Sequence, residues 1–317
     1  MKQFKYFIFF SIFILIFYMS CTYNQNMQVL SPKKYFLKSI AKKDSSRIIY
    51  AGVRSSSYGI YPFPQPEQWN TAMDTMSSYF PGSTKCAIWI VGVMGSNLQT
   101  CQMEFPSDGK NHPHVIFKSY DKHEKYLKYF DENNIKVFLQ VEPASASVPA
   151  LIDLMLNRYG NHKCVIGVGI DVEWYRVSEK PEWGIPVKND TAKMWEQRVK
   201  SFNSDYRLFL KHWDRDWMPS TYRGDIVFVD DSQGFNGLNQ MVDEFTNYWA
   251  KHFYPNTVFF QYGYNWDKPW WKNLVNPPKT IGDAIAGKIA QESGMFWVDF
   301  TLKDVLPLET GVTGITE

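Results

Sequence analysis

The sequence predicts an α/β fold in which eight parallel strands close into a (β/α)8 barrel. Three observations lead to this prediction: short apolar strands recur along the chain, amphipathic segments separate most of them, and eight is the number of strands that closes such a barrel. The 317 residues, 44% of them hydrophobic, are enough for one large core. An open, doubly wound sheet is the alternative fold.

The elements follow from composition and periodicity. The predicted strands cover residues 47–53, 86–94, 135–143, 164–174, 207–213, 225–231, 257–264 and 295–300. Amphipathic stretches predict helices at 123–134, 148–160, 192–206 and 238–253. About eleven residues separate the fifth and sixth strands, and no full helix follows the eighth. We therefore expect a barrel with a shortened fifth helix and no full final helix.

The N-terminus resembles an export signal. Lys2 and Lys5 precede an apolar run, 7–19, of about 13 residues, which suits a signal peptide and is short for a membrane span. A small residue followed by Cys21 then resembles a bacterial lipobox, with Tyr18 where Leu is usual. We expect a lipoprotein signal peptide at 1–20 with lipidation at Cys21, a tether at 21–45 with one short helix around 33–43, the barrel at 46–305 and a tail at 306–317. An uncleaved anchor helix or ordinary secretion is the alternative.

These features predict a monomer that is exported and lipid-anchored at the cell envelope. The formal net charge of +2 gives no electrostatic footprint for nucleic acid, or for a membrane beyond the lipid anchor. We expect no cofactor and no metal. Cys86, Cys101 and Cys164 fit no zinc pattern, and these three cysteines can form at most one disulfide. Four acidic residues of the last third do not have the spacing of a calcium loop either; they are Asp214, Asp216, Asp230 and Asp231.

The stretch "GVGIDVEWY" (167–175) places two carboxylates, Asp171 and Glu173, at the end of an apolar strand. Strand alternation puts Ile166, Val168, Ile170 and Val172 on one face, and Val165, Gly167, Gly169, Asp171 and Glu173 on the other. The branched face suits the outer helices, so the carboxylates point into the barrel at its C-terminal end, where barrel enzymes have their active sites. Glu173 should lie nearer the solvent, and Asp171 should lie deeper, bonded to a polar group of the third or sixth strand. Two neighbouring carboxylates raise one pKa, as a general acid requires.

A structural role is the alternative for this pair. Both carboxylates would then cap loops or pair with Arg176 or Lys211.

Three further strands end in candidate site residues. In "MFWVDF", alternation puts Trp297 and Asp299 on the inner face, as an apolar floor and a hydroxyl ligand for a sugar ring. A tryptophan that merely fills the barrel is an equal alternative. Either Asp230 or Asp231 must face inward at the end of strand six, and strand seven supplies polar or aromatic lining. Those residues are Gln261, Tyr262 and Tyr264.

Tryptophans are concentrated in the loops after these strands. Flat apolar rings beside acidic groups suit the faces of pyranose sugars. Six of the 12 tryptophans lie there: Trp183, Trp213, Trp217, Trp266, Trp270 and Trp271. Trp213 and Trp266 are the candidates for substrate contact.

The strand "GVGIDVEW" resembles the end of the strand-four signature of chitinase-like family 18 glycoside hydrolases, Asp-x-x-Asp-x-Asp-x-Glu. Asp171 and Glu173 match its last Asp and its catalytic Glu, while Ile166 and Gly169 stand at the two earlier Asp positions. Trp297 and the strand-six Asp are similar to that family's floor Trp and strand-six Asp. "DVEW" also resembles family 25 lysozymes, whose strand-one Asp has no counterpart here.

These residues predict a hydrolase of glycosidic bonds, acting on a polysaccharide or an amino-sugar glycan. Glu173 is the expected general acid and Asp171 the group that raises its pKa. The family 18 resemblance implies that Asp171 also orients the substrate's own N-acetyl group as the nucleophile. The alternatives are a sugar-binding surface lipoprotein without catalysis, or a barrel that serves only as a scaffold for partner contacts.

Overall fold

The structure is a computed structural model that describes residues 47–308. The expected signal peptide, Cys21, the tether and most of the expected tail therefore lie outside the described residues. Within the described part, no helix is both long enough and apolar enough to cross a membrane.

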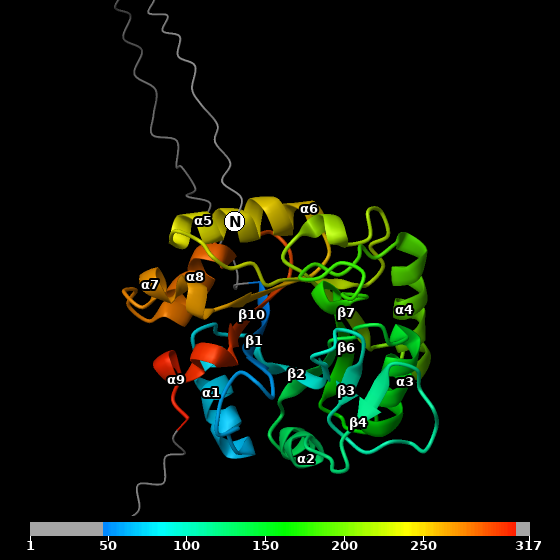
Figure 1. Cartoon of the computed structure of the whole chain (residues 1–317). Helices are drawn as coiled ribbons and strands as arrows, with labels where there is room; N and C mark the ends of the chain where they lie inside the picture. Colours follow the sequence, from blue (N-terminus) through cyan, green and yellow to red (C-terminus); the bar gives the residue numbers. More distant parts are fainter. Residues whose placement is uncertain (1–46, 309–317) are drawn as a thin grey trace, which may run out of the picture. The chain divides into compact units, whose positions relative to one another are not determined.

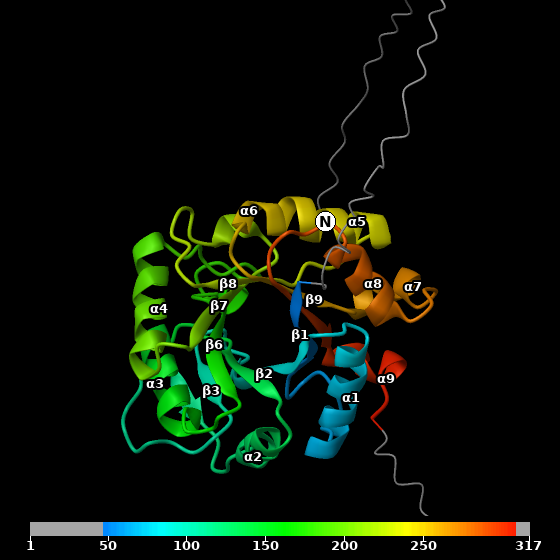
Figure 2. The same cartoon turned by 180° about the vertical axis from the view of Figure 1, so that it is seen from behind.

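Eight parallel strands form a closed barrel, which confirms the predicted fold. They are β1 (Ile48–Ser55), β2 (Thr84–Met94), β5 (Lys136–Val141), β6 (Val165–Asp171), β7 (Arg207–Lys211), β8 (Val227–Asp230), β9 (Val258–Tyr262) and β10 (Ser293–Val298). Closure is complete because β1 pairs in parallel with both β2 and β10. Figures 1 and 2 show this ring from its two ends, with the helices outside it.

Helices cover the outside of the barrel. They are α1 (Pro66–Ser78), α2 (Glu124–Glu132), α3 (Val148–Tyr159), α4 (Asn189–Phe202), α5 (Leu238–Asp243), α6 (Lys251–Phe253), α7 (Lys268–Trp271), α8 (Pro277–Ala286) and α9 (Leu302–Val305). A π-helical segment, η3 (Glu244–Ala250), joins α5 to α6. As predicted, β7 and β8 are joined without a full helix, through the short η2 (Arg215–Trp217), and the chain after β10 holds only η5 (Asp299–Thr301) and α9 before residue 308.

One insertion was not predicted. After β2 the chain forms two three-residue strands, β3 (Cys101–Met103) and β4 (Val115–Phe117). β3 runs antiparallel to the end of β2, and β4 pairs with β3. Such short strands carry little periodic signal, so residues 95–118 read as a loop in the sequence.

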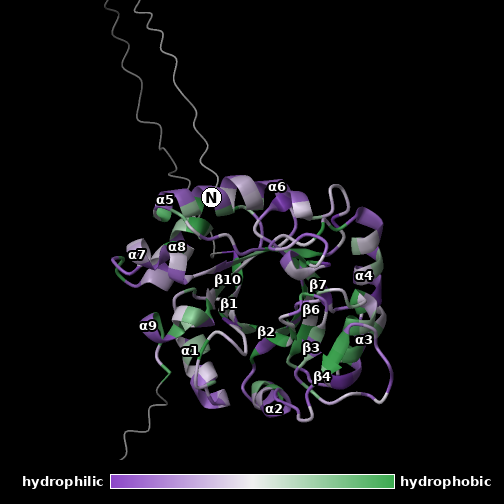
Figure 3. Ribbon diagram, viewed as in Figure 1, coloured by the Kyte–Doolittle hydropathy of each residue, from purple (hydrophilic) through white to green (hydrophobic). Residues whose placement is uncertain are grey.

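The barrel interior is apolar over most of its depth. Its buried cluster draws one or two side chains from most strands: Cys86, Ile88, Phe138, Phe209, Val227, Val229, Phe259 and Phe296. A second, larger cluster lies between the strands and the helices and includes Val168 and Ile170 of β6. Figure 3 shows the hydrophobic colouring concentrated on the strands and the hydrophilic colouring on the surrounding loops.

The start of β6 corrects the predicted alternation. Its register against β5 shifts between Val165 and Gly167, which leaves Ile166 as an extra residue. Val165 consequently packs in the outer cluster and Ile166 against the inner one, opposite to the prediction. Beyond this irregularity the predicted phase holds: a side chain at Gly169 would collide with the ring of Phe209 inside the barrel.

Candidate active site

A polar layer lies above the apolar interior, at the C-terminal ends of the strands. Asp171, the last residue of β6, is fully buried, and its Oδ2 accepts a hydrogen bond from Gln140 Nε2 of β5 at 3.1 Å. Glu173 follows in the short helix η1 (Val172–Trp174), and 22% of its side chain is exposed. The structure therefore places Asp171 deep, bonded to the third barrel strand, and Glu173 nearer the solvent.

Lys211 is the centre of this layer, although from the sequence it was only an alternative partner for the two carboxylates. Its Nζ lies 2.9 Å from Oδ2 of Asp171, pairs with Oδ2 of Asp231, and lies 4.0 Å from Oε2 of Glu173. Lys211 ends β7, two positions after the inward Phe209, so strand alternation directs it into the barrel. The other proposed partner, Arg176, pairs with Glu179 at the surface instead.

One ammonium thus lies beside three carboxylates, and this arrangement affects which of them holds a proton. Burial and the charge of Asp231 raise the pKa of Glu173 well above its ordinary value, against the opposing effect of Lys211. Burial raises the pKa of Asp171 to about 7, with Lys211 again opposing. Burial alone would lower the pKa of Lys211, but Asp171 and Asp231 hold it well above its usual range. Glu173, the farthest from the ammonium, is the carboxyl that keeps a proton near neutral pH.

A cavity of about 400 Å³ opens beside this group. Four carboxylates line it, namely Glu173, Asp214, Asp231 and Glu244. Three aromatic side chains and two small polar ones complete the wall: Trp213, Phe235, Tyr248, Ser232 and Gln233. Asp214 and Trp213 lie in the loop after β7, Asp231 follows β8, and Glu244 begins the π-helical segment η3. The volume and the mixture of aromatic and polar lining are those of a small-molecule site.

The loop carrying Asp214 is fixed by a neutral histidine. Burial lowers the pKa of His212 to about 4, so its Nδ1 accepts a hydrogen bond from the backbone N–H of Asp214 at 2.7 Å. Its Nε2 lies 3.0 Å from the carbonyl oxygen of Trp183. Tyr248 donates its hydroxyl to Oδ1 of Asp214 at 2.9 Å. These bonds hold one wall of the cavity in place.

Asp230 and Asp231, at the end of β8, the sixth strand of the barrel, point in different directions. Asp231 pairs with Lys211 and lines the cavity. Asp230 follows the outward Phe228 by two positions and is fully buried, with its Oδ1 accepting from the backbone N–H of Ser232. Burial raises the pKa of Asp230 well above its ordinary value, and the nearby Glu244 adds to this. Asp230 was therefore a wrong candidate, because the strand alternation turns it away from the barrel axis.

Two more candidates were wrong: Tyr262 on β9 and Trp297 on β10, the seventh and eighth strands of the barrel. Trp297 is fully buried in the outer cluster, 5.4 Å from the ring of Tyr262 and 5.2 Å from that of Trp271, and its Nε1 donates to Thr301. The hydroxyl of Tyr262 donates to the carbonyl oxygen of Pro278 in α8. Both side chains face the helices. The prediction for Trp297 was one position out of phase, since all four residues 295–298 are apolar and Phe296 is the inward one.

Asp299 is enclosed and already satisfied. It lies beyond the end of β10, in η5, where strand alternation no longer applies. Arg54 pairs with its Oδ1 at 2.9 Å, and both the backbone N–H and the hydroxyl of Ser56 donate to its Oδ2. With 1% of its surface exposed, it cannot hold a sugar hydroxyl as expected.

A second polar network adjoins Arg54, and the sequence did not reveal it. The guanidinium donates to the hydroxyl of Tyr58 at 2.8 Å, and that hydroxyl donates to Oε1 of Glu142. Glu142 also accepts from the backbone N–H of Met94 at 2.9 Å and is 4% exposed. Glu142 directly follows β5, so its place after the inward Gln140 was the available signal.

Two further candidates, Gln261 and Tyr264, are buried and do not form part of the cavity wall. Gln261 is fully buried on the inner face of β9, where its Oε1 accepts from the hydroxyl of Tyr264 at 3.4 Å. Tyr264, 7% exposed, has its pKa raised by burial and by Asp231, which places it beside the carboxylate group. Neither residue lines the cavity.

The loop tryptophans form two groups. Trp183 packs against Trp213 and Trp217, with ring centroids 4.2 and 5.0 Å apart, and Trp213 lines the cavity. The second group does not reach the cavity. In that group Trp271 is buried against Trp297, Trp270 is partly buried, and Trp266 is 76% exposed. Of the two tryptophans expected to touch substrate, the structure places only Trp213 at the site.

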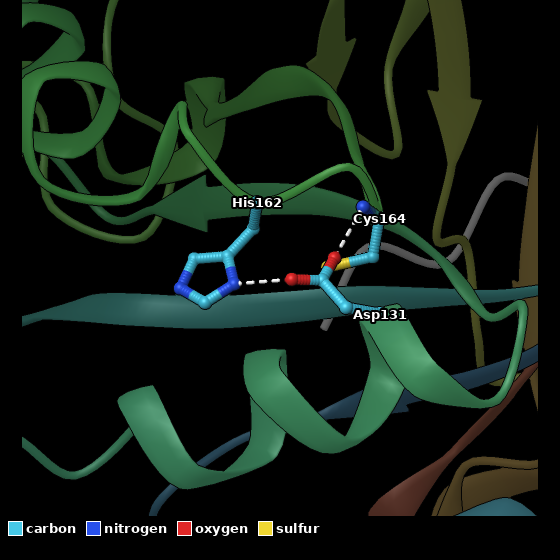
Figure 4. A group of neighbouring side chains, drawn as sticks. All are labelled: Asp131, His162 and Cys164. Carbon is cyan, nitrogen blue, oxygen red and sulfur yellow. Dashed lines mark hydrogen bonds and ion pairs between the residues drawn. The ribbon is translucent and has the colours of Figure 1, made fainter.

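A possible metal site lies elsewhere. Among the described residues, the side chains gathered closely enough to ligate a metal ion are Asp131, His162 and Cys164, whose ligand atoms lie within 4.8 Å of one another (Figure 4). Both Asp131 oxygens are already occupied, one by the N–H of Cys164 and one by Nδ1 of His162, each at 2.7 Å. Burial raises the pKa of the Cys164 thiol well above its usual range. These bonds tie the end of α2 to the start of β6, at the N-terminal end of the barrel, where side chains ordinarily serve stability.

Comparison with known proteins supports the fold. No family model matches the sequence, and no curated protein matches it. A candidate α-L-fucosidase from Bacteroides thetaiotaomicron superimposes with a TM-score of 0.51 at 11% identity, covering 86% of this chain and 91% of that one. An intracellular xylanase from Thermoanaerobacterium saccharolyticum gives a TM-score of 0.39 at 10% identity, covering 81% and 87%. A β-glucuronidase from an uncultured Clostridium species gives 0.39 at 11%, covering 57% and 37%.

At such identities the likeness shows a common fold alone, and the two matches with TM-scores of 0.39 carry no further weight. The resemblance to families 18 and 25 is not confirmed by these matches. The chain is a (β/α)8 barrel of the architecture found among glycoside hydrolases.

Proposed function

We propose that this chain hydrolyses glycosidic bonds, with Glu173 as the general acid that protonates the leaving oxygen. The observation that carries the proposal is the position of Glu173: it lies on the cavity wall, partly exposed, and burial and Asp231 raise its pKa. A general acid must hold its proton at the working pH and also reach the substrate. Glu173 meets both requirements.

Asp231 is the complementary carboxylate. It lines the same cavity and forms an ion pair with the buried ammonium of Lys211. Hydrolysis of a glycosidic bond passes through a transition state in which the sugar ring becomes positively charged. We assign to Asp231 the stabilisation of this charge from the wall of the cavity.

Asp171 acts through Glu173 and not on the substrate. It is fully buried, and its Oδ2 is engaged by Lys211 and Gln140. Its charge contributes to the raised pKa of Glu173. Direct orientation of an N-acetyl group, which the family 18 resemblance implies, would require an exposed carboxylate at this position.

The test is Glu173→Gln, which keeps the shape of the side chain and removes its acidic proton. Loss of general acid catalysis lowers turnover about 10²–10⁴-fold. Product release from a panel of glycans measures this, with Glu179→Gln as the matched control, because Glu179 pairs with Arg176 at the surface. Full turnover by Glu173→Gln on every glycan that the wild type cleaves would contradict the assignment.

Sugar binding without catalysis is the second candidate, and one observation favours it. Lys211 neutralises part of the charge of Asp171 and Asp231, as in a site built for rigidity. A glycan array on which the wild type binds tightly, with no product released from any bound glycan, would select this function.

The N-terminal sequence supports a location at the cell envelope. We propose that Cys21 is lipidated after removal of residues 1–20 and anchors a monomeric domain. Metabolic labelling with a fatty acid tests this, because Cys21→Ser should abolish the label.

A further inference from the structure

The cavity beside Glu173 is unusually acidic. Its lining contains four carboxylates and, among the described residues, no lysine, arginine or histidine. The nearby Lys211 ammonium is already paired with Asp171 and Asp231. In the described part of the chain, neither Asp214 nor Glu244 forms an ion pair. This wall of the cavity therefore has negative charge without a matching cation.

Arg215 does not supply that cation. It is adjacent in sequence to Asp214, but its guanidinium lies over the ring of Tyr248, 4.2 Å from the centroid, and donates to the carbonyl oxygen of Tyr248. It is not part of the lining. Burial and the charge of Asp214 raise the pKa of Glu244 to about 7, although the charge of Arg215 acts in the opposite direction. The two carboxylates repel each other as the structure stands, and a bound cation would relieve this repulsion.

A second observation points to a ligand. Among the residues that the structure describes, none bonds to Oδ1 of Asp231, although only 6% of this side chain is exposed and it lines the cavity. Buried carboxylate oxygens are almost always bonded, so an unbonded acceptor in a side chain at a cavity wall calls for a donor from outside the chain.

The size of the cavity and the spacing of its carboxylates favour an occupant larger than a bare metal ion. A volume of about 400 Å³ is that of a small-molecule site. Among the described residues, the carboxylates lining this cavity do not gather as a metal site would; the group that does is Asp131, His162 and Cys164. Trp213 and Tyr248 offer flat aromatic surfaces instead, which suit the apolar face of a sugar ring.

We propose that this cavity binds a sugar that carries a free, protonated amino group, such as a glucosamine or galactosamine residue without its N-acetyl group. The ammonium pairs with Asp214 and Glu244, and a hydroxyl donates to the open oxygen of Asp231. The inference rests on the proposed function, because Glu173 on the same wall is the acid that would cleave the bound glycan. It narrows the substrate class from glycans in general to cationic ones.

Binding to sugars that differ only at carbon 2 tests the proposal. Isothermal titration of the full chain carrying Glu173→Gln would compare β-1,4-linked tetramers of glucosamine, N-acetylglucosamine and glucose, together with α-1,4-linked galactosamine oligomers. We expect at least one of the two amine-bearing oligomers to bind at least tenfold more tightly than the neutral ones, and to weaken at high salt, because charge-assisted bonds replace neutral contacts.

Matched variants locate the effect. Adding Glu244→Gln or Asp214→Asn should weaken binding of the amine-bearing oligomer about tenfold and leave neutral sugars unchanged. Asn at 214 can still accept the N–H of Asp216, so that turn is kept. The control is Asp216→Asn, an exposed acidic residue of the same loop that does not line the cavity.

Three results would overturn the inference. The first is equal or tighter binding of the acetylated or neutral tetramers, and the second is no measurable binding of either amine-bearing oligomer. The third is saturable binding of Ca²⁺ that depends on Glu244 and that the amine-bearing oligomers do not displace. Failure of the proposed function looks different. In that case wild-type protein binds the amine-bearing oligomer with the expected preference and releases no product from it.

Discussion

The Nζ atom of Lys211 lies 2.9 Å from Oδ2 of Asp171, with 3% and 0% of the two side chains exposed. The same ammonium pairs with Asp231 and lies 4.0 Å from Glu173. A single buried cation thus sets the charge of the whole carboxylate group. Because it cannot neutralise three carboxylates, the most distant one keeps its proton.

Lys211→Met should destabilise the fold strongly. Removing one partner of a buried ion pair leaves an uncompensated charge, at a cost of about 3–5 kcal/mol in the free energy of unfolding. Urea unfolding measures this. Lys200→Met is the control, because Lys200 pairs with Asp225 at the surface and should change stability by less than about 1 kcal/mol. Equal effects of the two substitutions would show that Lys211 does not hold the site together.

Asp231→Asn should lower kcat strongly and Asp230→Asn should leave it almost unchanged, although the two residues are adjacent. Asp231 lines the cavity and pairs with Lys211, so its replacement should lower kcat about 10²-fold or more. Asp230 is buried on the helix side, and its raised pKa keeps it uncharged, so Asn should leave kcat within about twofold. Comparable losses of kcat in both variants would rule out this division of roles.

Trp297→Ala should act on stability. The indole is fully buried between Tyr262 and Trp271, and truncation of such a side chain costs about 3–5 kcal/mol. Trp266→Ala is the matched control, since Trp266 is 76% exposed and should change the free energy of unfolding by about 0.5 kcal/mol at most. If Trp297→Ala weakened only glycan binding and left urea unfolding unchanged, Trp297 would belong to the site after all.

Glu244 should make the fold less stable as the pH rises. Its pKa is about 7 in the folded chain, against about 4.3 for an unperturbed glutamate. Between these values the folded state holds a proton that the unfolded state has released, so stability is lost as the pH rises from about 4 to 7. Glu244→Gln removes this contribution.

The difference in free energy of unfolding between Glu244→Gln and wild type should therefore shift in favour of the variant over this pH range. The matched control is Glu179→Gln, the same substitution at a surface residue. A constant difference for Glu244→Gln would mean that its carboxyl is not perturbed in the fold.

The sequence predicted the barrel because period-two strands and amphipathic helices alternate along the chain. It also predicted the inward end of β6 correctly, since Asp171 after two glycines can face only one way without burying charge against the helices. In β10 the same reasoning failed. Met295, Phe296, Trp297 and Val298 are all apolar, so periodicity alone could not choose which face is inside.

Much of the rest of the site depends on contacts that no local pattern encodes. Lys211 is an exception, because its alternation with Phe209 in β7 indicates a side chain that points into the barrel. Glu244 lies in a π-helical segment after β8, and only the packing of that segment brings it to the cavity. Asp299 lies just past the end of its strand, where η5 redirects the side chain.

The central claim is that Glu173 donates a proton to the leaving oxygen. The most direct measurement compares wild type with Glu173→Gln on two glycosides of the same sugar: one with an alkyl or sugar leaving group, which needs protonation, and one with a dinitrophenyl leaving group, which does not. We predict a loss of kcat/KM of about 10²–10⁴-fold on the first and a loss of less than about tenfold on the second. Equal losses on both substrates, or no loss on either, would contradict it.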